Sequence, residues 1–178
     1  MHRLLPAPDM PHPAVEIAVE VAVVEVGLFR LSFHVTGDVC SIIWPPVTAP
    51  ERVDELWQHS CFEAFLGLGD GPGYVEMNFA PSRQWAAYRF DDYRQGMQAL
   101  ADFDAPEINV EGGQGDGFAL SARFDLSRLA NASPISLGLS AVIEDIDGNK
   151  SYWALRHPPG PPDFHHRDCF ALTLLPPA

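Results

Sequence analysis

A repeated alternation of apolar and polar residues along short segments is the feature that most constrains this fold. Within the segment from Ala14 to Val26, the odd positions from 15 to 23 carry valine or isoleucine, while the even positions begin with Glu16, Ala18 and Glu20. The segment from Leu28 to Val35 repeats this two-residue period. Successive side chains of a strand point to opposite faces of a sheet, so this period predicts strands with one buried face.

The same pattern recurs along the rest of the chain, between turns such as GDGPG and GGQGDG. Further strands are predicted at Val39–Trp44, Cys61–Leu68, Tyr74–Ala80, Gln84–Phe90, Ile108–Glu111, Phe118–Asp125, Ile135–Ile143, Tyr152–His157 and Cys169–Leu174. A short helix is predicted near Glu51–Trp57. We therefore expect an all-β protein, a single antiparallel β-sandwich with one or two short helical turns. Residues 14–178 would form this one domain, and the Pro-rich residues 1–13 a loose N-terminal arm.

Composition narrows the classes of partner. The 178 residues carry a formal net charge of -13, which disfavours nucleic acids and anionic membrane surfaces as partners. No apolar run is long enough for a signal peptide or a membrane span, so the expected location is the cytoplasm. The three cysteines, Cys40, Cys61 and Cys169, lack metal-site spacing, and each is expected to serve as a small apolar core residue.

The hairpin formed by Cys61–Leu68 and Tyr74–Ala80 places several polar groups on one face. Its apolar residues must share one side of the sheet, because a slip of one residue would bury the polar set. The register that satisfies this condition pairs Phe65 with Glu76 and Glu63 with Asn78. Directly opposed side chains have Cβ atoms about 5 Å apart. Glu63, Glu76 and Asn78 are therefore predicted to form one polar cluster on the face turned away from the core. The simpler alternative is a solvated face whose polar groups satisfy each other.

Three stretches of this sequence resemble family 9 carbohydrate-binding modules and the wider DOMON-like group. They are the LW at Leu56–Trp57 with CFEAFL following it, the return strand YVEMNFAPS, and the C-terminal DFHHRDCFALTL. The resemblance covers about residues 53–90 and 137–174 and implies a jelly-roll β-sandwich that recognises a sugar or a haem.

The sugar-binding members of that family hold a terminal sugar between two aromatic rings and bond its hydroxyl groups through a strand glutamate. By motif position, Trp57 resembles the first aromatic, Glu63 the carboxylate and Phe164 the second aromatic. We expect Asn78 to act with Glu63 as a hydroxyl partner, and the rim to consist of Glu76, His165 and His166. The remaining tryptophans, Trp44, Trp85 and Trp153, lie in alternating segments and are expected in the core or on a sheet face.

No nucleophile elbow, metalloprotease motif, phosphate-binding loop or dinucleotide fingerprint is present, so we expect no catalysis and no cofactor. The predicted partner is a small saccharide or a sugar-containing metabolite. Other functions stay open at this point. Met77 with His165 or His166 could ligate haem b, and the two histidines with Asp168 a metal ion. Glu63 and Glu76 could form the acid pair of a glycosidase. Alternatively, the domain could dock onto a protein and bind no small ligand.

Overall fold

The structure, a computed structural model, describes residues 1–25, 27–69, 71–101, 103–115, 117–128 and 134–174, so Val26, Asp70 and Asp116 of the predicted strands and turns lie outside it. Its strands are β1 (His2–Pro6), β2 (Val15–Glu25), β3 (Leu28–Gly37), β4 (Cys61–Leu68), β5 (Tyr74–Phe79), β6 (Trp85–Phe90), β7 (Gln98–Ala99), β8 (Glu107–Gly112), β9 (Gly117–Asp125), β10 (Ile135–Glu144), β11 (Lys150–Ala154) and β12 (Leu172–Leu174). Three short 3-10 helices, η1 (Val39–Ser41), η2 (Leu56–Gln58) and η3 (Arg167–Cys169), complete the described elements. The predicted all-β class is confirmed. Within the described ranges, no helix has the length and apolarity needed to cross a membrane.

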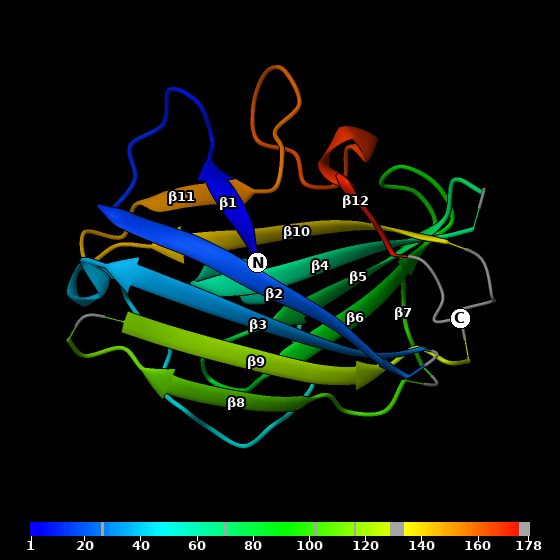
Figure 1. The fold of residues 1–178 in the computed structure, drawn as a ribbon, viewed down its shortest axis with the longest axis horizontal. Helices are drawn as coiled ribbons and strands as arrows, with labels where there is room; N and C mark the ends of the chain where they lie inside the picture. Colours follow the sequence, from blue (N-terminus) through cyan, green and yellow to red (C-terminus); the bar gives the residue numbers. More distant parts are fainter. Residues whose placement is uncertain (26, 70, 102, 116, 129–133, 175–178) are drawn as a thin grey trace.

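All strands belong to one hydrogen-bonded sheet, in the order β7-β6-β5-β4-β10-β11-β1-β2-β3-β9-β8, with β12 added beside β10. The pairings between these strands are antiparallel, as predicted. Figure 1 shows the sheet curling so that β2, β3 and β9 cross in front of β4, β5 and β6. This half-barrel shape is consistent with the predicted sandwich.

The main core fills the space inside the curl. Rings from the two halves of the sheet meet there: Phe33 on β3 lies 4.8 Å from Phe62 on β4, and Phe79 on β5 lies 5.5 Å from Phe124 on β9, centroid to centroid. Met77 and Trp153 belong to the same buried cluster. Burial of each such large side chain contributes about 1.5–3 kcal/mol to the stability of the fold. The two-residue alternation of the strands directs these side chains into the curl, and their burial stabilises it.

The prediction of a loose arm over residues 1–13 is wrong for its first half. Residues 2–4 pair with β2 and residues 5–6 with β11, so β1 joins the two halves of the sheet. The side chain of Leu4 is fully buried, whereas that of Leu5 is half exposed. This single pair of a buried and an exposed residue lies between prolines, and it is too short an alternation to predict a strand.

Leu4→Ala should therefore lower the free energy of unfolding by about 2–5 kcal/mol, because it empties part of the core. Leu5→Ala, one residue further on the exposed side of the same strand, is the matched control and should change stability by less than about 0.5 kcal/mol. Urea denaturation of both variants measures the difference. Equal effects of the two substitutions would show that β1 is not part of the core.

Three predicted element boundaries also need correction. Residues 39–41 form η1 instead of a strand, because the chain turns away at Gly37, where a Cβ atom would lie 2.5 Å from the carbonyl oxygen of Ala14. Cys40 is consequently exposed, whereas Cys61 and Cys169 are buried as expected. Cys169 ends η3 and does not begin the last strand. The predicted helix at residues 51–57 shrinks to η2, because backbone groups of Glu51 and Val53 are bonded to Trp85.

Candidate ligand-binding site

The face of β4, β5 and β6 turned away from the main core carries a second apolar cluster. Its members alternate with the core residues along each strand: on β4, Cys61 and Phe65 face outward while Phe62 and Ala64 face inward. We call this second set the outer cluster; it comprises Leu56, Cys61, Phe65, Tyr74, Ala80, Ala86, Tyr88, Phe90, Val142, Ala154 and Phe164. This face is therefore covered by other parts of the chain, and the alternative of a simply solvated face is wrong.

Glu63, Glu76 and Asn78 lie on this outer face in the predicted register. The structure pairs Glu63 with Asn78 and Phe65 with Glu76. Nδ2 of Asn78 donates a hydrogen bond to Oε1 of Glu76 at 2.8 Å, and Oγ of Ser140 donates one to Oε2 of Glu63 at 3.1 Å. These four side chains form a row across β10, β4 and β5, which we call the polar row. Glu63 is 3 % exposed, Glu76 7 % and Asn78 1 %, so the row lies at the bottom of the outer cluster.

Burial changes the charge of the polar row. Burial, followed by repulsion from Glu76, raises the pKa of Glu63 to about 8, although the hydrogen bond from Ser140 opposes the shift. The pKa of Glu76 is also raised, mainly by burial. At neutral pH Glu63 is therefore mostly a neutral acid, which can donate as well as accept a hydrogen bond. The polar row therefore combines two carboxyl groups, an amide and a hydroxyl group, which supply both hydrogen-bond donors and acceptors.

Trp57 occupies an exposed position on the same side of the sheet. It lies in η2, which contacts β4 and β5, and its side chain is 49 % exposed. Trp85 and Trp153 are buried and Trp44 is stacked on Phe118 at 3.8 Å, as expected for core or sheet-face residues. Trp57 is therefore the most exposed of the four tryptophans.

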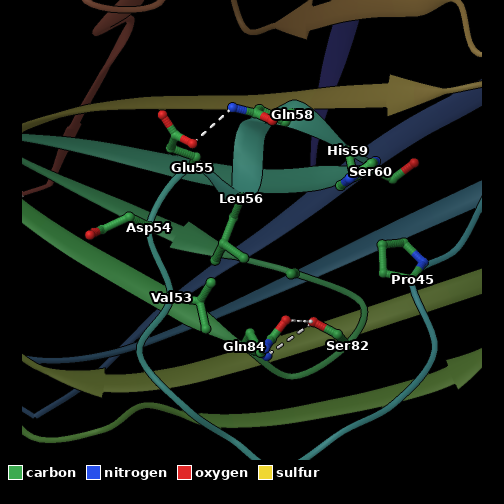
Figure 2. Close-up of a pocket in the computed structure, with 11 residues that line it drawn as sticks. Pro45, Val53, Asp54, Glu55, Leu56, Gln58, His59, Ser60, Ser82 and Gln84 are labelled. Atoms are coloured by element: carbon green, nitrogen blue, oxygen red, sulfur yellow. Dashed lines mark hydrogen bonds between the residues drawn. The ribbon is translucent and has the colours of Figure 1, made fainter.

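A recess of about 250 Å³ opens beside η2. Its lining consists of Pro45, Val53, Asp54, Glu55, Leu56, Gln58, His59, Ser60, Ala80, Ser82 and Gln84. Figure 2 shows the bonded pair of Ser82 and Gln84 on one side of the recess, and Glu55 bonded to Gln58 on another. The sequence analysis did not select these residues. Seven of them, however, lie at positions 53–56 and 58–60 on either side of Trp57, and that proximity was the available signal.

The segment from Asp163 to Phe170 covers the other end of the outer face. Phe164 is only 8 % exposed and lies in the outer cluster, with its ring 6.1 Å from that of Tyr152. His166 is partly exposed and lies next to the ring of Tyr93. Of the three predicted aromatic and histidine contacts in this segment, His166 is thus the most accessible.

His165 and Glu76, predicted at the rim, lie inside instead. Nδ1 of His165 is hydrogen-bonded to the hydroxyl group of Tyr74 at 2.7 Å, and its Nε2 lies 3.8 Å from Oε2 of Glu76. The rings of Phe65, Tyr74 and Phe90 surround the imidazole edge-on. Burial lowers the pKa of His165 to about 4, so this histidine is neutral at physiological pH.

Asp163 holds this covering segment in place, and the sequence analysis did not identify it. Its carboxylate accepts hydrogen bonds from the guanidinium of Arg94 at 2.8 Å and from the hydroxyl of Tyr93. Both partners belong to the turn between β6 and β7. The two polar links join segments about seventy residues apart, which is why no local pattern revealed them.

The residues weighed for haem and metal do not assemble. Met77 is buried in the main core, whereas His165 lies on the opposite face of the sheet, so the two cannot share one iron atom. Among the residues that the structure describes, no group of three histidine, cysteine, aspartate or glutamate side chains is placed to hold a metal ion. His165 and His166 also point to different neighbours, Tyr74 and Asp168.

Comparison with known proteins places the chain by its fold. No model of a protein family matches the sequence, and neither does any curated protein. A candidate carbohydrate-binding protein from Bacteroides uniformis superimposes with a TM-score of 0.66 over 94 % of this chain and 82 % of its own, at 11 % identity. A family 9 carbohydrate-binding module from Caldicellulosiruptor kristjanssonii, solved with cellotriose, gives 0.52 over 89 % and 74 %, at 12 % identity.

The fold is like that of a family 9 carbohydrate-binding module. At 11–12 % identity the likeness concerns the path of the chain and says nothing about individual side chains. The role of the polar row, of Trp57 and of the recess therefore rests on the geometry of this structure.

Proposed function

We propose that this chain is a non-catalytic domain that binds a small saccharide or a sugar-containing metabolite. The curled sheet would be a β-sandwich, and the ligand would lie on its outer face next to η2. The observation that carries the proposal is the half-exposed indole of Trp57 on the face that holds the buried polar row. The solved structures of similar fold support it, since one is described as a carbohydrate-binding candidate and the other contains cellotriose.

In this proposal Trp57 supplies the stacking surface. A flat aromatic ring covers the C–H face of a sugar ring, while polar groups take the hydroxyl groups. The polar side chains of the recess beside η2, such as Ser82 and Gln84, would be partners for those hydroxyl groups. A recess of about 250 Å³ fits one sugar unit better than a long chain.

Glu63, Glu76 and Asn78 would act as the deeper hydroxyl partners. Glu76 is the most exposed of the three, and it lies opposite Tyr88 on β6. Glu63 and Asn78 are already satisfied by Ser140 and Glu76, and would bond the ligand only after the covering segment with Phe164, His165 and His166 shifts. Such a site discriminates against analogues that lack a hydroxyl group, because its own polar groups would be left unpaired.

The experiment that tests the proposal is a titration of a saccharide panel, followed by calorimetry and tryptophan fluorescence. Wild-type protein should bind at least one sugar, and Trp57→Ala should weaken that binding by about tenfold or more, because it removes a stacking contact of about 1–3 kcal/mol. Val24→Ala, which alters a similarly exposed apolar side chain on β2, is the control and should bind normally.

Two outcomes would contradict the proposal. If no sugar binds the wild-type protein, the outer face serves another purpose, and docking onto a protein becomes the better interpretation. If Trp57→Ala binds as well as wild type, the ligand lies elsewhere. The size of the recess sets the order of the panel: mono- and disaccharides and nucleotide sugars are tested before insoluble polysaccharides.

A further inference from the structure

The loop that presents Trp57 is fastened to the sheet by a buried phenol. The hydroxyl group of Tyr88 on β6 donates a hydrogen bond to Oδ1 of Asp54 at 2.6 Å. Tyr88 is itself 7 % exposed, and its ring belongs to the outer cluster. Asp54 lies three residues before Trp57, so this bond fixes the start of the loop against a rigid strand.

Glu55 also restrains the loop that carries Trp57, and it does so in an unusual backbone conformation. Its φ of 61° and ψ of 28° lie in the left-handed region, which a residue with a Cβ atom adopts at some energetic cost. Its carbonyl oxygen accepts a hydrogen bond from the backbone of Gln58, and its carboxylate accepts one from the side chain of Gln58 at 3.0 Å. The hydrogen bonds between Glu55 and Gln58 therefore close a turn that contains Trp57. Contacts with the surrounding residues must hold this strained turn in place.

The far end of the loop is fastened as well. His59 Nδ1 lies 2.7 Å from a carboxylate oxygen of Glu144, and Ser60 Oγ donates to the carbonyl oxygen of Ile43 at 2.7 Å. The backbone N–H of Glu144 donates to the same Ser60 hydroxyl group. The exposed indole therefore projects from a loop with fixed ends.

Tyr88 also connects the loop with the polar row. It is directly opposite Glu76 in the β5–β6 pairing. The pKa of its phenol is raised by burial, then by the hydrogen bond and charge of Asp54 and by the charge of Glu76, while a hydrogen bond to the Glu55 backbone opposes the shift. One phenol thus contacts the loop of the proposed stacking ring and neighbours the proposed hydroxyl partners.

We propose that Tyr88 and Asp54 are positioning residues, which hold the Trp57 indole at a fixed distance and angle from the polar row. This inference rests on the proposed saccharide function. A site that is pre-organised in this way loses less conformational entropy when a ligand binds. Tyr88 does not line the recess, so its effect is transmitted through Asp54 and the orientation of Trp57, whereas Asp54 itself also lines the recess.

The test combines binding with a direct report on the indole. Protein labelled with 5-fluorotryptophan gives four fluorine resonances, one for each tryptophan, and Trp57→Phe assigns the relevant one. In Tyr88→Phe the Trp57 resonance should shift and narrow, while the other three stay in place. Affinity for the best sugar of the panel should fall by about three- to tenfold, the amount that one intramolecular hydrogen bond contributes.

The matched variants separate positioning from general damage. Tyr152→Phe removes a hydroxyl group from a partly buried tyrosine that packs against the outer cluster, and should leave the Trp57 resonance and the affinity unchanged. Asp54→Ala should reproduce Tyr88→Phe, whereas Asp54→Asn, which keeps an acceptor oxygen, should largely restore both readouts. The double variant Asp54→Ala/Tyr88→Phe should be no worse than either single one, because both remove the same bond.

The results that would overturn the inference differ from the result that would overturn the proposed function. An unmoved Trp57 resonance in Tyr88→Phe would overturn the inference, whether or not sugar binds. A moved resonance with unchanged sugar affinity would overturn it as well. If no sugar binds wild type, the proposed function fails together with the positioning role that depends on it.

Discussion

Trp153→Ala is expected to unfold the domain or to leave it barely stable. Trp153 is 2 % exposed in the main core on β11, and its indole N–H donates a hydrogen bond to Oγ of Ser151 at 3.0 Å. His12, from the N-terminal segment, packs edge-on against its ring at 5.1 Å. Replacement by alanine leaves a large cavity, which costs about 3–5 kcal/mol, against a total stability of about 5–15 kcal/mol for a domain.

Trp57→Ala is the matched control for this substitution, because it deletes the same side chain from an exposed position. Its free energy of unfolding should stay within about 0.5 kcal/mol of wild type, whereas its sugar binding should weaken by about tenfold or more. Urea denaturation followed by far-UV circular dichroism measures both variants. A stable, folded Trp153→Ala protein that had lost only its binding would show that the two tryptophans have been assigned the wrong roles.

The stability of the domain should fall as the pH rises from about 5 to about 8, and Glu63 should cause much of that fall. Burial and the neighbouring Glu76 raise the pKa of Glu63 from its ordinary 4.5 to about 8. Between these values the folded state keeps a proton that the unfolded chain has released. Stability is therefore complete below the lower value and is lost progressively towards the upper one, with each pKa unit worth about 1.4 kcal/mol.

Glu63→Gln should remove this dependence, because the amide keeps the shape and an acceptor for Ser140 but does not titrate. The variant should be more stable than wild type at pH 9, and the difference should shrink towards pH 5. Urea midpoints measured across this range give the comparison. Glu20→Gln, which changes an exposed carboxylate on β2, should run parallel to wild type. A Glu63→Gln curve that is also parallel to wild type would mean that Glu63 is charged in the folded state.

The register of the β4–β5 hairpin could be predicted because it depends on parity alone. A strand with one apolar face admits only pairings that keep that face on one side, and the turn length selected the pairing of Glu63 with Asn78. The burial of the same residues could not be predicted in this way. The cover over the polar row comes from the segment around Asp163 and from the turn at Arg94, which are distant in sequence and meet through an ion pair.

The missed N-terminal strand has a related cause. β1 contributes five residues, and only Leu4 among them is fully buried, so its periodicity is too short to recognise between prolines. The position of η2 was predicted only approximately, because Glu51 and Val53 use their backbone groups to bond Trp85 on β6. Tertiary pairing there overrides the local helical preference.

The most direct test of the account is a ¹H–¹⁵N correlation spectrum recorded during addition of the best-binding sugar. The side-chain N–H signal of Trp57 and the amide signals of Glu63, Glu76 and Asn78 should shift together and saturate with one dissociation constant, while those of β2 and β3 stay in place. Shifts confined to β2 and β3, or a Trp57 signal unaffected at saturation, would contradict the assignment of the outer face as the ligand-binding site.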